Sequence, residues 1–154
     1  MAYRIERLAP DTFESLFGMT DGELASRNAV RMTADSPTGY PCRVSLQDAA
    51  PGEELILLNH VSHDVSTPFR TAYAIYVRKG AEPASFTDEA PDYLDRRTLS
   101  LRGFDEAGML RDAALAMPGE ADAGIRALFD RPGIAIIHAH NAAQGCFLAR
   151  IERN

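Results

Sequence analysis

Residues 134–152 read IAIIHAHNAAQGCFLARIE, and this stretch decides the fold. It contains two segments, 134–140 and 146–152, whose residues alternate between two faces as they do in β-strands. The loop between them includes Asn141 and Gly145, which suit the left-handed dihedral angles of a hairpin turn. The sequence therefore predicts that the chain ends in a β-hairpin.

The apolar residues of this hairpin favour one register of its two strands. With His140 opposite Cys146, Ala139 faces Phe147, and one face of the hairpin is uniformly apolar. A shift by one residue would mix polar and apolar groups on both faces. Directly opposed side chains lie roughly 4.5–5.5 Å apart at Cβ. We therefore expect two imidazoles and a thiol close together on the other face, which holds His138, His140, Cys146, Leu148 and Arg150.

The rest of the chain supplies more short strands than helices. Residues 120–130 predict a helix with Ile125 and Phe129 on one face. Shorter helices are expected after Asp11 and Thr20, where the sequence resembles a capping box. The remaining assignments are strands at 2–8, 29–34, 42–46, 54–58, 72–79 and 98–104, with loops at 59–71 and 80–91.

Two structures are consistent with residues 105–117. A helix is favoured by Asp105 as a cap, by the alanine-rich composition and by the stop at Pro118-Gly119. The alternative is a hairpin that turns at 105–108 and returns as a strand through Met109 and Arg111. The residues alone leave both structures open.

The balance of elements predicts an α+β protein. Many short strands with few helices between them are typical of a mostly antiparallel sheet with a few short helices packed on it. A chain of 154 residues has the length of one domain. We therefore expect a single domain over residues 1–154, closed by the C-terminal β-hairpin.

Composition argues against several classes of function. The chain has 22 acidic and 16 basic residues, and the basic ones are scattered, whereas nucleic-acid binding requires a basic surface. No apolar run approaches the roughly 18 residues that cross a bilayer, and the first residues show no secretory signal. We expect a cytoplasmic protein without a nucleic-acid or membrane partner.

The polar face of the hairpin has the residue types of a metal site. His138, His140 and Cys146 supply nitrogen and sulfur ligands that suit Zn²⁺. The fourth ligand would come from one of His60, His63, Cys42 or Asp64.

The residues of this face also suit two other kinds of site. A thiolate at Cys42 or Cys146, activated by His140 or Arg43, would be a nucleophile or a redox thiol. Alternatively, arginine side chains would bind a small anionic ligand, because a guanidinium matches the oxygens of a carboxylate or phosphate. The residues predicted to bind such a ligand are Arg43, Arg70, His138, His140, Asn141 and Arg150.

A purely structural interpretation of these residues is also open. Cysteine is among the most buried residue types, and a histidine beside a turn often caps backbone groups without doing chemistry. His60 and His63 lie in a polar stretch and are expected to be solvated. Because the chain has no G-x-S-x-G, P-loop, G-x-G-x-x-G or H-E-x-x-H pattern, the sequence assigns no enzymatic reaction.

Four segments carry a resemblance to a known family: PCRVSL at 41–46, PGEEL at 51–55, STPFR at 66–70 and HAHNAAQGC at 138–146. On these segments the chain resembles the bacterial domain-of-unknown-function family DUF1203. The resemblance implies a small bacterial protein and transfers no activity or catalytic residue. It also favours the hairpin over the helix at 105–116.

Two functional hypotheses follow. In the first, a small-molecule, anion or metal site lies where the loop before Cys42 meets the terminal hairpin. In the second, the protein is a non-catalytic module with inert, buried cysteines and histidines, and an exposed sheet edge or face makes a homodimer or docks a protein partner.

Overall fold

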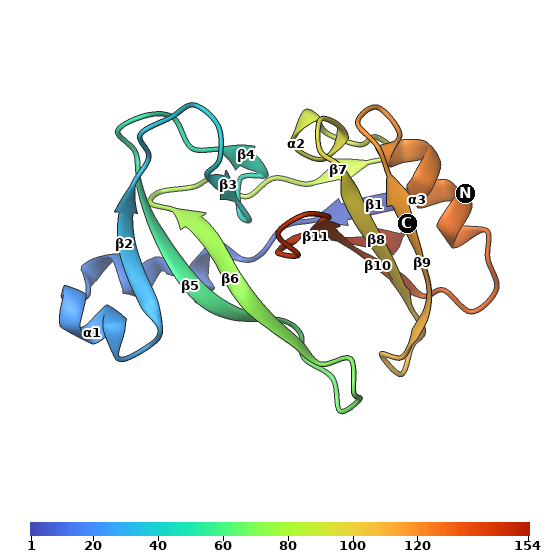
Figure 1. Ribbon diagram of the computed structural model, residues 1–154, viewed down its shortest axis with the longest axis horizontal. Helices are drawn as coiled ribbons and strands as arrows, with labels where there is room; N and C mark the ends of the chain where they lie inside the picture. Colours follow the sequence, from blue (N-terminus) through green and yellow to red (C-terminus); the bar gives the residue numbers. More distant parts are fainter.

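A computed structural model describes all 154 residues as two β-sheets flanked by short helices. The five-stranded sheet and the six-stranded sheet lie at opposite ends of the molecule, and both chain termini lie at the six-stranded sheet (Figure 1). The helices are α1 (Asp21–Ala25), α2 (Asp92–Asp95) and α3 (Ala121–Phe129), preceded by the 3₁₀ helices η1 (Pro10–Thr12) and η2 (Glu14–Gly18). The α+β class with mostly antiparallel strands is confirmed.

The six-stranded sheet contains the terminal hairpin at its centre. Every neighbouring pair in it is antiparallel. Its strand order is β7 (Phe86–Thr87), β1 (Tyr3–Glu6), β11 (Phe147–Arg153), β10 (Ile136–Asn141), β8 (Leu99–Phe104) and β9 (Leu110–Ala116). Residues 105–117 therefore form the turn and second strand of a hairpin, and the helical alternative is wrong.

The five-stranded sheet is built around one long hairpin. Its order is β2 (Ala29–Thr33), β5 (Glu54–His63), β6 (Thr71–Arg78), β3 (Pro41–Cys42) and β4 (Gln47–Asp48). The strand predicted to end at residue 58 continues to His63, so the loop predicted at 59–71 is shorter than expected. Its polar residues fit a strand because pairing with β6 satisfies the backbone up to the hairpin tip.

Helix α3 covers the outer face of the six-stranded sheet. Its buried residues, Ala121, Ile125, Leu128 and Phe129, match the apolar face expected from the sequence. They pack against Leu101, Ile137 and Ile151 in the larger of the apolar clusters. The opposite face of this sheet is turned toward the five-stranded sheet.

The predicted register of the terminal hairpin is wrong in detail. The ladder is shifted by two residues, so that Ala139 pairs with Ala149, and a β-bulge that leaves Leu148 without an opposite residue then pairs His140 with Phe147. Leu148 therefore joins Ala149 in the apolar cluster under α3. Phe147 turns instead to the face that carries the two histidines, where its ring centroid lies 5.3 Å from that of His138.

Candidate functional site

Three strands place a row of basic side chains on the inner face of the six-stranded sheet. His138 in β10 lies opposite Arg102 in β8 on one side and opposite Arg150 in β11 on the other. Directly opposed residues of a sheet project from the same face. We call Arg102, His138 and Arg150 the cationic row.

His138 occupies the centre of this row and is buried. Its side chain is 1% exposed, and neither ring nitrogen has a hydrogen-bond partner. Its ring packs against Phe104 and Phe147, and lies 5.0 Å from the ring of His63 in the five-stranded sheet. Buried polar groups are almost always hydrogen-bonded, because leaving them unpaired costs about 1–3 kcal/mol.

Burial also keeps the inner histidines uncharged. It lowers the pKa of His138 to about 3, with the neighbouring His63 and His140 acting in the same direction. Burial likewise lowers the pKa of His140 to about 4, although the hydrogen bond from its Nδ1 to the Gly145 carbonyl at 2.9 Å opposes this shift. The positive charge of Arg102 disfavours protonation of both rings.

Both arginines of the row have N–H groups that donate to no acceptor within the protein. Arg102 donates only its Nε hydrogen, to Ser100 Oγ at 3.3 Å, and has no carboxylate partner; burial lowers the pKa of its guanidinium. Arg150 donates its Nε hydrogen to Glu152 at 2.6 Å. The Nη groups of both side chains make no hydrogen bond within the protein.

A cavity of about 470 Å³ opens at the Arg150 end of this row, and neither Arg102 nor His138 lines it. It is lined by the tip of the β5–β6 hairpin, the β8–β9 turn and the start of β10, with Arg150 and His63 among its walls. Its rim is acidic, because Asp64, Asp105 and Glu106 also line it. Asp105 is neutralised by Arg111 at 2.6 Å, whereas Glu106 has no ion-pair partner.

Arg43 joins the two sheets at another point. Its side chain is 1% exposed, and its Nε hydrogen is donated to the carbonyl of Phe147 at 2.7 Å. A second hydrogen bond runs from Nη1 to the carbonyl of Pro41, and no carboxylate pairs with the guanidinium. The Pro41–Arg43 segment and the terminal hairpin are thus in direct contact.

The two cysteine thiols contact groups other than the histidines. Cys42 is buried in the apolar cluster of the five-stranded sheet, and its Sγ accepts a hydrogen bond from the backbone of Arg78 at 3.3 Å. Cys146 is 7% exposed and its Sγ contacts Gln144 Oε1 at 3.9 Å. Both thiols are free, and no hydrogen bond links either one to an imidazole.

The zinc site expected at His138, His140 and Cys146 is not supported. The structure contains no group of three histidine, cysteine or acidic side chains that could hold a metal ion. The two strands pair two residues away from the expected register, and after the bulge Phe147, not Cys146, lies opposite His140. The rings of His138 and His140 have their centroids 6.3 Å apart.

Two other predicted ligand-binding residues serve local structure. Asn141 Oδ1 accepts hydrogen bonds from the backbone of Ala143 and Gln144, at 3.2 and 3.4 Å, and so closes the hairpin loop. Arg70 is exposed and pairs with Asp64 at 3.4 Å on the tip of the β5–β6 hairpin.

Similarity to known proteins extends over most of the chain. The family model described as a protein of unknown function, DUF1203, matches residues 39–153. The chain belongs to this family. No curated protein and no solved structure matches it.

The family match includes the whole candidate site of this DUF1203 protein. Arg43, Arg102, His138 and Arg150 all lie within the matched residues, whereas β1, α1 and β2 precede them. No helix has both the length and the apolar character needed to cross a membrane.

Sequence reasoning missed Arg102, and it named His63 only as a candidate zinc ligand or a solvated side chain. Arg102 was assigned to a strand, but nothing in the sequence indicated that β8 would lie beside β10. His63 was placed in a polar loop, yet it ends β5 and is buried against Phe104, with ring centroids 4.0 Å apart. The alternation of residues in 98–104 is the signal that could have placed Arg102 on a particular face.

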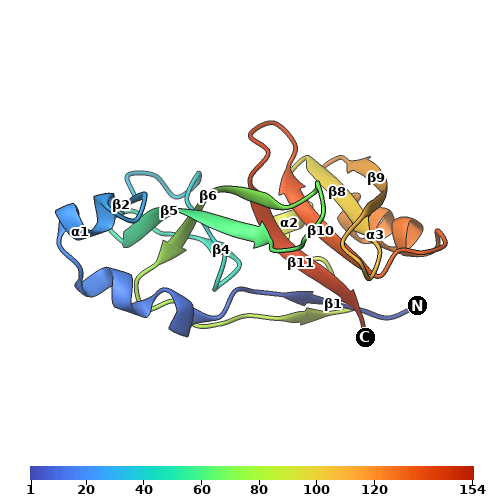
Figure 2. The ribbon, with the colours of Figure 1, turned by 90° about the horizontal axis from the view of Figure 1, so that it is seen from below.

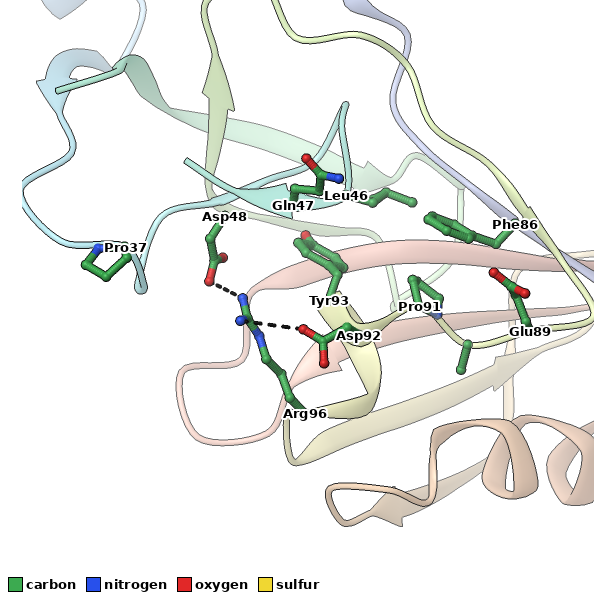
Figure 3. Close-up of a pocket in the computed structure, with 11 residues that line it drawn as sticks. Pro37, Leu46, Gln47, Asp48, Phe86, Glu89, Pro91, Asp92, Tyr93 and Arg96 are labelled. Atoms are coloured by element: carbon green, nitrogen blue, oxygen red, sulfur yellow. Dashed lines mark hydrogen bonds and ion pairs between the residues drawn. The ribbon is translucent and has the colours of Figure 1, made fainter. Parts of the chain in front are cut away.

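The DUF1203 protein has a larger cavity elsewhere, of about 670 Å³, between β4 and α2 (Figure 3). Arg96 crosses one side of it and pairs with Asp48 and Asp92. Asp48 is also held by Arg97 at 2.8 Å. Since no unsatisfied buried polar atom lines this cavity, it offers less reason to expect a ligand than the cationic row.

Proposed function

We propose that this protein binds a small anionic molecule, with a carboxylate as the simplest candidate, beside the cationic row. The observation that carries the proposal is that His138 is fully buried between two arginines while both of its ring nitrogens lack a partner. A ligand oxygen at this position would accept a hydrogen bond from the imidazole and from an arginine Nη group.

The charges around the row favour an anion over a neutral ligand. Arg43 and Arg102 are at least half buried and have no carboxylate partner, so their charges are uncompensated within the protein. A buried charge without a partner is costly, and a bound anion removes this cost. Binding would also raise the pKa of His138, because a nearby negative charge favours the imidazolium.

The rim of the cavity limits which anions fit. Asp64 and Asp105 are paired with Arg70 and Arg111, so Glu106 places the one unpaired negative charge on the cavity wall, which repels a polyanion more than a monoanion. The volume of about 470 Å³ suits a small metabolite. We therefore favour a ligand with one carboxylate whose other end is neutral or positively charged.

Titration with four probes tests the proposal: acetate, glycine, succinate and inorganic phosphate. The chain has four histidines, so the imidazole nitrogens can be followed individually by NMR. We expect saturable shifts of His138 and His63, with acetate and glycine binding more tightly than succinate or phosphate. If all four probes leave the His138 nitrogens unchanged, the protein has no anion site here.

Variants of the row identify the contacts. Arg102→Gln and Arg150→Gln should each weaken acetate binding by roughly 10–100-fold, the worth of a charge-assisted hydrogen bond. The matched control is Arg27→Gln, which removes one exposed positive charge next to α1 and should leave acetate binding unchanged. Equal losses in all three variants would indicate only a general effect of net charge.

The free edge of the six-stranded sheet favours a second candidate function, homodimerisation. Strand β9 has no neighbour on its outer side, and Leu115 in it is 65% exposed. Unpaired edge strands with exposed apolar side chains are the usual sites of strand addition. Sedimentation of the wild type and of Leu115→Lys tests this: a dimer that becomes monomeric in the variant would support it, and a wild-type monomer at high concentration would end it.

A further inference from the structure

We infer that the tip of the β5–β6 hairpin is a gate over the cationic row. The gate consists of His63, Val65 and Thr67, which close on Gly108 in the β8–β9 turn. The role of the gate in ligand entry rests on the proposed anion binding, whereas its opening can be tested without any ligand.

Three contacts of the gate meet at Gly108, and the ring of His63 also packs on Phe104, with ring centroids 4.0 Å apart. His63 Nε2 and Thr67 Oγ1 donate hydrogen bonds to the carbonyl of Gly108, at 3.0 and 3.1 Å. Val65 lies against the Cα of this glycine so closely that a Cβ there would be 2.6 Å from Val65 Cγ1. With φ at +86°, Gly108 holds a left-handed conformation that also disfavours any other residue.

The two sheets are fastened much more firmly at another place. The chain crosses between the sheets twice, near residues 8 and 84. Leu8 donates its backbone hydrogen to the carbonyl of Arg43, and Ala84 donates to that of Val44, at 2.9 and 3.1 Å. The two crossings run side by side along one side of the molecule (Figure 2). Both crossings and the Arg43 side chain thus converge on a single short segment.

This arrangement has a fixed side and a releasable side. The fixed side is covalent and includes the buried Arg43, whereas the gate depends on two hydrogen bonds, the contact of Val65 with Gly108 and the packing of His63 on Phe104. The cavity lies between the parts that the gate joins, since its walls include both the hairpin tip and the β8–β9 turn. Release of the gate would therefore widen the cavity next to His63 and uncover the route to His138.

Carbethoxylation by diethyl pyrocarbonate, mapped by mass spectrometry, measures the opening of the gate through the accessibility of His138. The reagent modifies neutral, accessible imidazoles, and the chain provides its own reference. His60 is partly exposed and packs against Phe13, away from the cationic row. The measured quantity is the modification rate of His138 divided by that of His60 in the same sample.

Thr67→Val keeps the shape of the side chain and removes one of the two hydrogen bonds to Gly108, together with the hydrogen bond that Thr67 Oγ1 accepts from the backbone of Phe69 at 3.2 Å. We expect the rate ratio to rise about fivefold, as for the loss of one neutral hydrogen bond. Thr67→Ser keeps the hydroxyl and should restore the wild-type ratio. Thr71→Val is the matched control, because Thr71 bonds only to Phe69 within the same hairpin.

Three results would overturn the gate. The first is an unchanged ratio in Thr67→Val, and the second is an equal rise in the rates of His60 and His138, which would indicate general unfolding. The third is a rise that also occurs in Thr71→Val, since the tip contact would then not be the cause. Because no anion is present, a working gate combined with failed acetate titrations would disprove the proposed function and leave the gate standing.

Discussion

Arg43, in the turn between β3 and β4, donates its Nε hydrogen to the backbone carbonyl of Phe147 in the six-stranded sheet, at 2.7 Å. This guanidinium is buried and fastens the end of the terminal hairpin to the segment before β4. Methionine at this position has a similar length but no donor, so Arg43→Met removes the hydrogen bonds to the carbonyls of Phe147 and Pro41. We expect it to lower the free energy of unfolding by about 2–4 kcal/mol.

Urea denaturation checks the role of Arg43, with Arg27→Met as the control. Arg27 is exposed and makes no ion pair, so its replacement should change the free energy of unfolding by less than about 0.5 kcal/mol. Equal effects of the two substitutions would contradict a bridging role for Arg43.

Replacing His138 by phenylalanine separates stability from function. The ring packs between Phe104 and Phe147, and its nitrogens have no partners to lose. His138→Phe should therefore be as stable as the wild type or more stable by about 1–2 kcal/mol, while acetate no longer binds. His140→Phe is the comparison, because it loses the bond to Gly145 and should be less stable by about 1 kcal/mol. Chemical denaturation without anions gives the free energies of unfolding of the wild type and of both variants. A destabilised His138→Phe would show that this imidazole has a structural partner.

Stability should fall as the solution becomes acidic, well before the carboxylates titrate. His138 and His140 have pKa values of about 3 and 4 in the folded protein, against about 6.5 in the unfolded chain. Below pH 6.5 the unfolded state therefore takes up protons that the folded state excludes, and folding loses free energy. At pH 5 the loss is about 2 kcal/mol for each histidine.

Urea denaturation at pH 7.5 and pH 5.0 measures this acid sensitivity. His138→Phe should remove about half of the difference between the two pH values, because one of the two titrating rings is gone. A wild-type protein that is equally stable at both pH values would mean that the imidazoles accept protons without unfolding.

The packing at Gly108 predicts an unusually costly glycine replacement. Gly108→Ala combines a left-handed φ with a clash against Val65, whereas Gly39→Ala meets the left-handed φ alone, because nothing lies within 4 Å of its Cβ. We expect the first substitution to cost about 1–2 kcal/mol more than the second. Val65→Ala in the Gly108→Ala background should recover part of this excess, because it removes both Cγ contacts and leaves the Cβ of residue 65 at 2.9 Å. The double-mutant cycle would show no coupling if the two residues were not in contact.

The thiols should differ in accessibility. Cys42 is fully buried and Cys146 only slightly exposed, so a thiol reagent should modify Cys146 slowly and Cys42 only after unfolding. Cys146→Ser should abolish the native reaction and leave acetate binding unchanged. Rapid native modification of Cys42 would instead show that the apolar cluster around it opens.

Several elements of the fold could be predicted from residues that are close in the chain. The terminal hairpin, the helix near 121–129 and the capping box of Thr20 with Glu23 depend on local turn chemistry and periodicity. The preference for a hairpin at 105–116 came from the family resemblance, since the local composition also suits a helix. The histidines of β10 were correctly placed on one face, because alternation along a strand is a local property.

Tertiary structure decided what these residues do. The strands of the terminal hairpin pair two residues away from the expected register, so Cys146 does not lie opposite His140, while Leu148 at the bulge joins the apolar cluster under α3. Arg102 and His63 reach His138 only through strand order and sheet-to-sheet contact, which depend on residues tens of positions apart. Periodicity specifies the direction of a side chain from its own strand, whereas the identity of its neighbours follows from the way in which all buried apolar surfaces of the chain pack together.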